Sequence, residues 1–531
     1  MAAAAASVPA IESKLSKKPP KAGIAIFGLA LSIGFIYASV HLLSDLSAVH
    51  ATSIYPFVLL GVALLIALGF EFVNGFHDTA NAVATVIYTH SLEPHVAVVW
   101  SGMCNFLGVM TSTGAVAFGI ITLLPVELIL QVGSGSGFAM VFALLTAAIM
   151  WNLGTWYFGL PSSSSHALVG SIIGVGIANQ LMSEQTGTSG VDWAQATNVG
   201  ETLLISPFIG FVGAGLLLLV AKLVLRNPKL YQAPEGSQPP PWPIRLLLIG
   251  TCSGVSFAHG SNDGQKGMGL IMLILIGTMP TAYALNHAIT SQQTADFLTA
   301  SHETVDTLRK HVEGAATIGD PHDEVRKYVA DRDFTPSTML ALQQLIGDLS
   351  NQAELYKQPQ NMPERSMPNF RNNMYLVSEA LRLMKKSRHP ELTASDWVVL
   401  DNYKRQIDTA TRFIPTWVKV AVAMALGLGT MVGWKRIVVT VGEKIGIQHM
   451  TYAQGAAAEL TAMATIWSAD RLGLPVSTTH VLSSGVGGTM AANHSGLQWH
   501  TMRSLLMAWT LTLPSSVILA ASLFWLFRQV G

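Results

Sequence analysis

Charged residues are scarce in this chain of 531 residues: they make up 12% of it, while half of the chain is hydrophobic. A soluble domain ordinarily carries about 25% charge, so much of this protein is expected to face lipid rather than water. The 31 basic and 31 acidic residues cancel, which argues against a nucleic-acid partner. Two cysteines, Cys104 and Cys252, provide neither a disulfide framework nor metal-ligand spacing. No cofactor is expected.

Long apolar segments dominate the rest of the chain, and about 12 of them can be distinguished. A helix that spans a bilayer needs about 20 apolar residues. Several segments are shorter or are interrupted by glycine, which is typical of half-helices and re-entrant hairpins. We therefore predict an all-α polytopic membrane protein that contains broken helices.

The first apolar segment, residues 23–44, follows a tail that contains four lysines. The apolar run is longer than that of a signal peptide and lacks a clear small-residue cleavage site, so a retained helix is favoured. The positive-inside rule then places the N-terminus in the cytoplasm. For a bacterial protein this corresponds to a multi-pass protein of the inner membrane.

The segment 291–412 breaks the apolar pattern. It contains 17 acidic and 15 basic residues, so it holds 32 of the 62 charged residues of the chain. Its helical patterning predicts a soluble helical insertion, for which a spacer or regulatory module is the favoured interpretation.

Two short motifs occur twice, in the same order. Residues 75–81 (GFHDTAN) resemble residues 260–266 (GSNDGQK), and residues 159–166 (GLPSSSSH) resemble residues 473–480 (GLPVSTTH). The motifs are 88 residues apart in the first copy and 217 in the second, counted from aspartate to histidine, and the charged insertion accounts for most of the difference. Duplicated membrane units with interrupted helices are typical of transporters whose substrate site lies between the repeats. An inverted relation of the repeats is preferred.

The expected organisation follows from this duplication. Its parts are a cytoplasmic basic tail (1–22), an extra N-terminal transmembrane helix (23–44), a first transmembrane repeat (55–225), a linker (226–244), the first part of a second repeat (245–290), the soluble helical insertion (291–412) and the second part of the second repeat (413–531).

The hydroxyl-rich motif suits an anion site. In each copy a proline precedes serine or threonine residues and then an apolar helical run, so the hydroxyls are expected at a helix N-terminus. Such a terminus offers unpaired N–H groups and a partial positive charge, and it binds phosphate readily. Ordinary N-capping is the alternative for a single copy, but two matched copies favour binding. The candidate phosphate ligands are Ser163, Ser164, Ser165, Ser477, Thr478 and Thr479.

The acidic motif suggests coupling to a cation. Asp78 and Asp263 lie beside long apolar segments, and an ionised carboxylate at membrane depth costs at least about 2.5–3.5 kcal/mol. Two carboxylates near an anion require a proton or another cation to bind with it. A carboxylate also accepts a hydrogen bond from the acidic O–H of phosphate, which sulfate lacks, so the same aspartates can reject sulfate.

The copies differ where Asn81 in the first corresponds to Lys266 in the second. A lysine cannot ligate sodium, so this asymmetry favours proton coupling, with His77 beside the site and His166 and His480 as possible proton relays. Other polar residues in apolar segments, Glu71 and Glu459 among them, are more often packing or helix–helix contacts than ligands.

These motifs resemble the paired signatures of the inorganic phosphate transporter (Pit) family, over residues 57–527 of this chain. The resemblance implies a phosphate symporter with inverted repeats, coupled to sodium or protons and often dimeric. It assigns the hydroxyl residues above to phosphate, and Asp78 and Asp263 to the cation, with Asn81 and Asn262 beside them. The departures at His77 and Lys266 resemble the bacterial low-affinity, proton-coupled branch, whose substrate can be a neutral complex of a divalent metal with phosphate.

Three alternatives remain open from the sequence. A sodium-coupled phosphate symporter or a sulfate permease would use the same scaffold. An intramembrane hydrolase would need one privileged serine with a positioned base, whereas the hydroxyls here are repeated and redundant. A passive channel would need a continuous pore. We therefore expect a transporter rather than an enzyme, and the sequence leaves any metal site undetermined.

Overall fold

The computed structural model describes residues 15, 21–46, 54–78, 80–124, 129, 135–182, 191–234, 236, 238–312, 319–358, 361–363 and 365–530. Throughout these residues the protein is helical, and the extended pairing they contain is an isolated bridge between Gly446 and Leu497. The prediction of an all-α protein is therefore confirmed.

The first half of the chain forms helices of very different lengths. They are α2 (Lys21–Leu46), α3 (Tyr55–Asp78), α4 (Ala80–Tyr88), α5 (Pro94–Thr111), α6 (Ala115–Ile121), α8 (Gly135–Tyr157), α9 (Ser164–Met182) and α10 (Trp193–Val224), followed by the short 3-10 turn η1 (Pro228–Leu230). The second half begins with α11 (Trp242–Thr278) and α12 (Pro280–Tyr283), and it returns to the bundle with α18 (Thr416–Gly429), α19 (Lys435–Val439), the π-helical turn η3 (Thr440–Lys444), α20 (Tyr452–Arg471), α21 (Thr478–Ala492) and α22 (Trp499–Val530).

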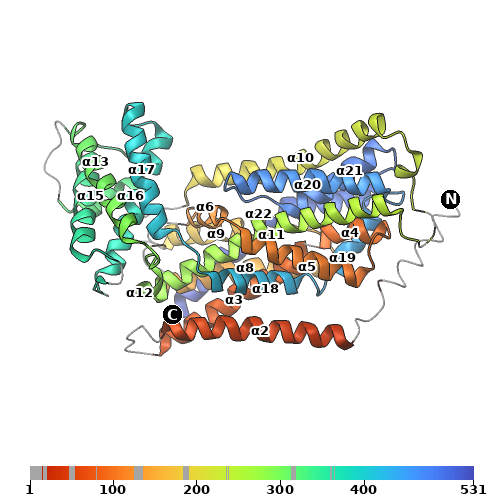
Figure 1. Ribbon diagram of the computed structural model, residues 1–531, viewed down its shortest axis with the longest axis horizontal. Helices are drawn as coiled ribbons and strands as arrows, with labels where there is room; N and C mark the ends of the chain where they lie inside the picture. Colours follow the sequence, from red (N-terminus) through yellow and green to blue (C-terminus); the bar gives the residue numbers. More distant parts are fainter. Residues whose placement is uncertain are drawn as a thin grey trace.

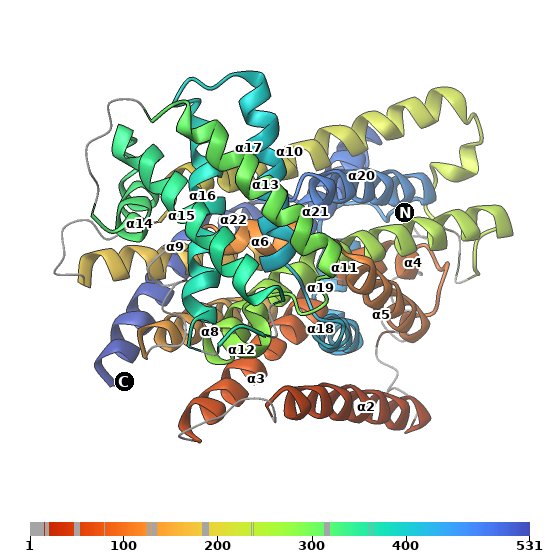
Figure 2. The same cartoon turned by 60° about the vertical axis from the view of Figure 1, so that its left-hand side comes forward.

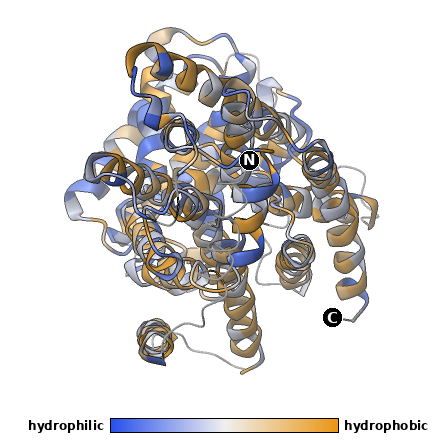
Figure 3. Ribbon diagram, turned by 90° about the vertical axis from the view of Figure 1, so that its right-hand side faces the viewer, coloured by the Kyte–Doolittle hydropathy of each residue, from blue (hydrophilic) through white to orange (hydrophobic). Residues whose placement is uncertain are grey.

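Among the described residues six helices are long and apolar enough to cross a membrane, or up to eight if each of two bent helix pairs counts as one span. The bent pairs are α5 with α6, at 76°, and α17 (Ala394–Thr411) with α18, at 72°. The predicted number of about 12 segments is not confirmed. Hydrophobic residues make up much of the bundle helices (Figure 3), and the exposed leucines and phenylalanines of α2, α10 and α22 fit a lipid environment.

The two halves of the bundle pack against each other through matching pairs of helices, each pair joining one helix from each half. Helix α10 packs on α21 and α22 packs on α9, while α5 packs on α11 and α18 packs on α3. The glycines of the repeated motif make this close approach possible: a Cβ at Gly75 would overlap the Leu426 carbonyl, and one at Gly260 would overlap the Asn105 carbonyl. The same contact is therefore made twice, each time between a glycine of one half and a carbonyl of the other.

Helices α3 and α11, which carry the acidic motifs, cross in opposite directions. Glu71 lies against Gly267, whereas Asp78, further along α3, lies near Asp263, which precedes Gly267 on α11. This antiparallel relation is that of an inverted repeat. Helix α11 runs unbroken through its motif, while α3 ends at Asp78 and α4 starts at Ala80.

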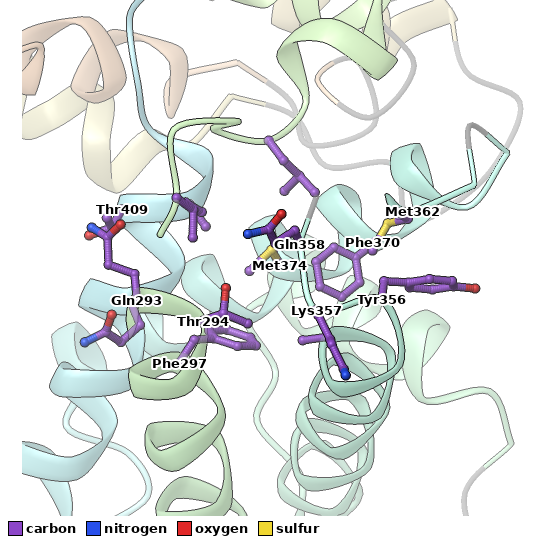
Figure 4. Close-up of a pocket in the computed structure, with 15 residues that line it drawn as sticks. Gln293, Thr294, Phe297, Tyr356, Lys357, Gln358, Met362, Phe370, Met374 and Thr409 are labelled. Carbon is purple, nitrogen blue, oxygen red and sulfur yellow. The ribbon is translucent and has the colours of Figure 1, made fainter. Parts of the chain in front are cut away.

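The charged segment forms a separate group of helices at one end of the bundle (Figures 1 and 2). They are α13 (Ser291–Arg309), α14 (Pro321–Asp331), α15 (Pro336–Tyr356), α16 (Met367–Ser387) and α17 (Ala394–Thr411). The group has its own hydrophobic core, and it encloses a mainly apolar pocket lined by Phe297, Tyr356, Phe370 and Met374 (Figure 4).

The insertion is joined to the membrane bundle by an ion cluster. Asp192 caps α10 by accepting from the Gln195 N–H, and its other oxygen lies 3.1 Å from Arg332 and 3.0 Å from Arg382. Arg382 also pairs with Glu379 at 2.5 Å. The neighbouring carboxylates Glu379 and Asp192 raise the pKa of Arg382 despite its partial burial, so its guanidinium stays charged.

Candidate functional site

The hydroxyl motifs form the N-termini of α9 and α21, as their Pro-x-Ser pattern predicts. Ser163 accepts a hydrogen bond from the His166 N–H at 3.2 Å, and Ser477 accepts one from the His480 N–H at 3.1 Å. These bonds to the third residue ahead are those of N-caps. In the structure the ordinary capping interpretation therefore describes Ser163 and Ser477, while the hydroxyls that follow them point elsewhere.

The two helix tips meet each other. Ser165 donates from Oγ to the Val476 carbonyl at 2.9 Å, which ties the first tip to the second motif. The rings of His166 and His480 lie 4.6 Å apart between centroids, and His480 also stacks on Trp509 at 4.3 Å. Residues more than 300 positions apart in the chain thus surround one buried region at the interface of the repeats.

Asp78 receives hydroxyl groups from both repeats. Ser164 of the first tip donates to its Oδ2, and Thr479 of the second tip donates to its Oδ1 at 2.8 Å. The same Oδ1 lies 2.8 Å from Nδ1 of His77, whose other nitrogen contacts Thr155 at 3.1 Å. Asp78 thus connects the two helix tips.

Asp263 forms an ion pair with a lysine, whereas Asp78 accepts hydroxyl groups. Lys266 Nζ lies 2.7 Å from Asp263 Oδ1, and neither side chain is exposed. Lys266 also donates to the hydroxyl of Ser165, while Nε2 of His259 lies 3.4 Å from Asp263 Oδ2. The side chains of Asp78, His259 and Asp263 approach within 4.8 Å of one another, so the two halves place their acidic motifs side by side.

This geometry can be compared with known proteins. A family model described as the phosphate transporter family matches residues 74–520, a range that contains both copies of both motifs. The chain belongs to the phosphate transporter family. The resemblance carried by the motifs is therefore confirmed, and the protein is a membrane protein of that family.

This member of the phosphate transporter family matches relatives over nearly their whole length. The low-affinity inorganic phosphate transporter PitA of Escherichia coli K12 is 43% identical over 493 residues, which cover 88% of this chain and 97% of the relative. PitB of the same strain is 39% identical over 500 residues, covering 90% and 98%. A solved structure described as the sodium-dependent phosphate transporter has 18% identity and a TM-score of 0.49, and the match covers 89% of this chain and all of that one.

Not every predicted residue of this family member lies where the sequence analysis places it. Asn262 is predicted beside the cation site, but its amide group binds the backbone of the second tip: it donates to the Leu474 carbonyl at 3.1 Å and accepts from the Val476 N–H at 3.4 Å. A short amide side chain fully engaged with the backbone fixes the tip rather than facing the interior of the site. Asn81 belongs to α4, but its side chain is outside the described residues.

Thr478 is a candidate phosphate ligand at the start of the second tip. It begins α21 and is buried, yet its hydroxyl has no hydrogen-bond partner within the part of the chain that the structure describes. Such a group is costly in a dry site, and it offers an unused donor at the second tip. Thr478 thus differs from Thr479, whose hydroxyl already binds Asp78.

Three polar residues of the site are missing from the predicted set. Asn74 accepts a hydrogen bond from Ser164 at 2.8 Å. Thr155 bridges His77 and Ser162, at 3.1 and 2.9 Å. Glu71 lies fully buried one helical turn before Asn74. Their spacing before Asp78, seven and four residues, puts Glu71 and Asn74 on the same face of α3 as the aspartate, although from sequence alone such residues are more often packing contacts than ligands.

Proposed function

We propose that this chain is a secondary active symporter that imports inorganic phosphate together with protons. The observation that carries the proposal is the shared coordination of Asp78, which accepts hydroxyl hydrogens from Ser164 and from Thr479, one from each repeat. Relatives over nearly the whole chain are named inorganic phosphate transporters, which supports phosphate as the substrate and gives no support to the hydrolase alternative.

The proposed chemistry begins at the helix tips. Helix N-termini and hydroxyls replace the hydration of an oxyanion without adding fixed charge, and Thr478 has a hydroxyl free to donate among the described groups. In the occupied site, Ser164 and Thr479 turn from Asp78 to the phosphate oxygens. Asp78 then loses its donors beside an anion, so it must be protonated for phosphate to stay bound. Phosphate and proton therefore bind together.

Lys266 supports a proton over sodium as the coupling ion. Its ammonium group sits 2.7 Å from Asp263, where a second metal ion would otherwise neutralise that carboxylate. A tethered ammonium cannot leave with the substrate. The second repeat thus supplies a permanent positive charge, Lys266, close to Ser165. The charge that changes during transport then comes from side chains that gain and lose the co-transported proton.

The test is labelled phosphate uptake into proteoliposomes under an imposed proton or sodium gradient, with and without magnesium. We expect the proton gradient to drive accumulation, and the comparison with magnesium decides whether a neutral metal–phosphate complex is the transported form. Asp78→Asn and Asp263→Asn should abolish driven uptake, whereas Asp45→Asn, which alters a carboxylate bonded to Tyr283 outside the site, should not. Uptake driven by sodium alone, or equal transport of sulfate, would contradict the proposal.

Orientation in a bacterial inner membrane is part of the same proposal. The last turn of α2 carries Asp45, which accepts a hydrogen bond from Tyr283 next to the insertion, so the start of α2 at Lys21 lies at the opposite end of the bundle (Figure 1). A cytoplasmic N-terminus then places the insertion in the periplasm. Cysteines introduced at the exposed residues Ser395 and Lys229 should react with a membrane-impermeant maleimide in intact cells at Ser395 only. The reverse pattern would invert the orientation.

A further inference from the structure

Glu71 is a buried acid beside the site that the proposed chemistry does not yet use. It lies on α3, two helical turns before Asp78, and is completely shielded from solvent. Its Oε1 faces the backbone of Gly267 on α11 so closely that a Cβ there would overlap it. Apart from the Gly267 backbone, that oxygen has no hydrogen-bond partner among the described residues, and Oε2 has a long contact of 3.5 Å from the Asn74 amide.

The surroundings of Glu71 offer little to stabilise a negative charge. Helices α4, α8, α9, α11 and α18 pack against α3, and of these α4 and α8 carry no acid, base or histidine. The acids, bases and histidines on the other helices are Arg245, His259, Asp263 and Lys266 on α11, His166 on α9 and Lys419 on α18, and α3 itself also carries His77 and Asp78. Lys266 is paired with Asp263 at 2.7 Å, and Lys419 donates to the Ser112 carbonyl at 3.0 Å.

A carboxylate in such a place is far more stable when it is neutral. Burial of an unpaired charge costs several kcal/mol even after relaxation, and a proton removes that cost. An anion bound at the tips adds a further penalty to ionised Glu71, because Gly267 adjoins Lys266, which contacts Ser165. Protonation of Glu71 and anion binding therefore favour each other, and this linkage is reciprocal.

We propose that Glu71 is a binding site for the co-transported proton. The inference rests on the proposed function and extends it to a residue outside the repeated motifs. When the phosphate leaves and water reaches the site, Lys266 can turn toward the ionised Glu71, and the proton is released. Glu71 acts on the substrate through charge, so it is a coupling residue rather than a phosphate ligand.

The experiment compares Glu71→Gln with the wild-type protein in two assays. Counterflow measures exchange of labelled phosphate against internal phosphate and needs no net proton movement, whereas accumulation under a proton gradient does. A glutamine mimics the protonated acid, so exchange should persist with a weaker pH dependence, the remainder coming from Asp78. Gradient-driven accumulation should fall by at least about fivefold, the lower end of typical linkage between two ligands.

Glu459→Gln is the matched control. Glu459 is also fully buried, on α20, but its two oxygens accept hydroxyl hydrogens from Thr85 and Thr251. We expect this variant to keep gradient-driven accumulation. If it loses accumulation while Glu71→Gln keeps it, the assignment to Glu71 is overturned.

Glu71→Asp is a second variant that keeps an ionisable group at this position. This variant should accumulate phosphate with a displaced pH profile, and size-exclusion chromatography checks that each variant is folded. Normal accumulation and an unchanged pH profile in Glu71→Gln would refute the inference, as would loss of exchange in a folded variant. A wild-type protein that ignores the proton gradient would instead refute the proposed function.

Discussion

Removal of the Lys266 ammonium tests the electrostatics of the site most directly. Lys266 and Asp263 form an ion pair of 2.7 Å in which neither side chain is exposed. Lys266→Met keeps much of the side-chain length and deletes the charge, so Asp263 loses its cation, and the charged or titratable partner that it keeps among the described residues is the imidazole of His259, at 3.4 Å.

The magnitude follows from the burial of both partners. Breaking a buried pair by deleting one partner costs about 3–5 kcal/mol, because the remaining charge is left uncompensated. Replacing both partners by neutral groups is often nearly neutral for stability. We therefore expect Lys266→Met to lower the free energy of unfolding by about 3–5 kcal/mol, and the double variant Asp263→Asn/Lys266→Met to recover most of that loss.

Denaturant titration of the purified protein in detergent measures both effects, with intrinsic tryptophan fluorescence as the signal. The double-variant cycle separates the pair from other effects of each substitution. Asp306→Asn is a suitable control, because Asp306 pairs with Arg309 on the exposed surface of α13 and such pairs contribute little. If Lys266→Met unfolds like the wild type, or the double variant is no more stable than the single one, the buried ion pair does not have the role assigned here.

Two further predictions concern the helix contacts. Gly260→Ala should reduce the yield of folded protein measured by gel filtration, because its Cβ would overlap the Asn105 carbonyl and overpacking of this kind costs about 1–3 kcal/mol or more. The control Gly250→Ala, also in α11 but facing open space, should fold normally. Equal yields of the two variants would disprove the close contact. Asp192→Ala should speed trypsin cleavage of the insertion, since Arg332 and Arg382 lose their shared carboxylate; an unchanged cleavage rate would show that the cluster does not hold the insertion in place.

Local patterns in the sequence determined the helix ends and the duplication. The Pro-x-Ser segments predicted the starts of α9 and α21 because capping depends on a hydroxyl and an N–H only three residues apart, as in Ser163 with His166 and Ser477 with His480. The two copies of each motif predicted a membrane transporter of the Pit type, and the low charge predicted an apolar helical bundle, since both signals are present in the order and composition of the residues.

The tertiary structure decided which of those residues face one another. Asp78 and Thr479 are 401 positions apart and meet because the repeats pack in opposite directions. Asn262 turned out to bind the backbone of the second tip, and Glu71, given little weight from its position alone, lies against Gly267. Spacing along one helix gives the face on which a residue lies, but only the antiparallel crossing of α3 and α11 decides whether that face meets lipid, a partner helix or a buried charge.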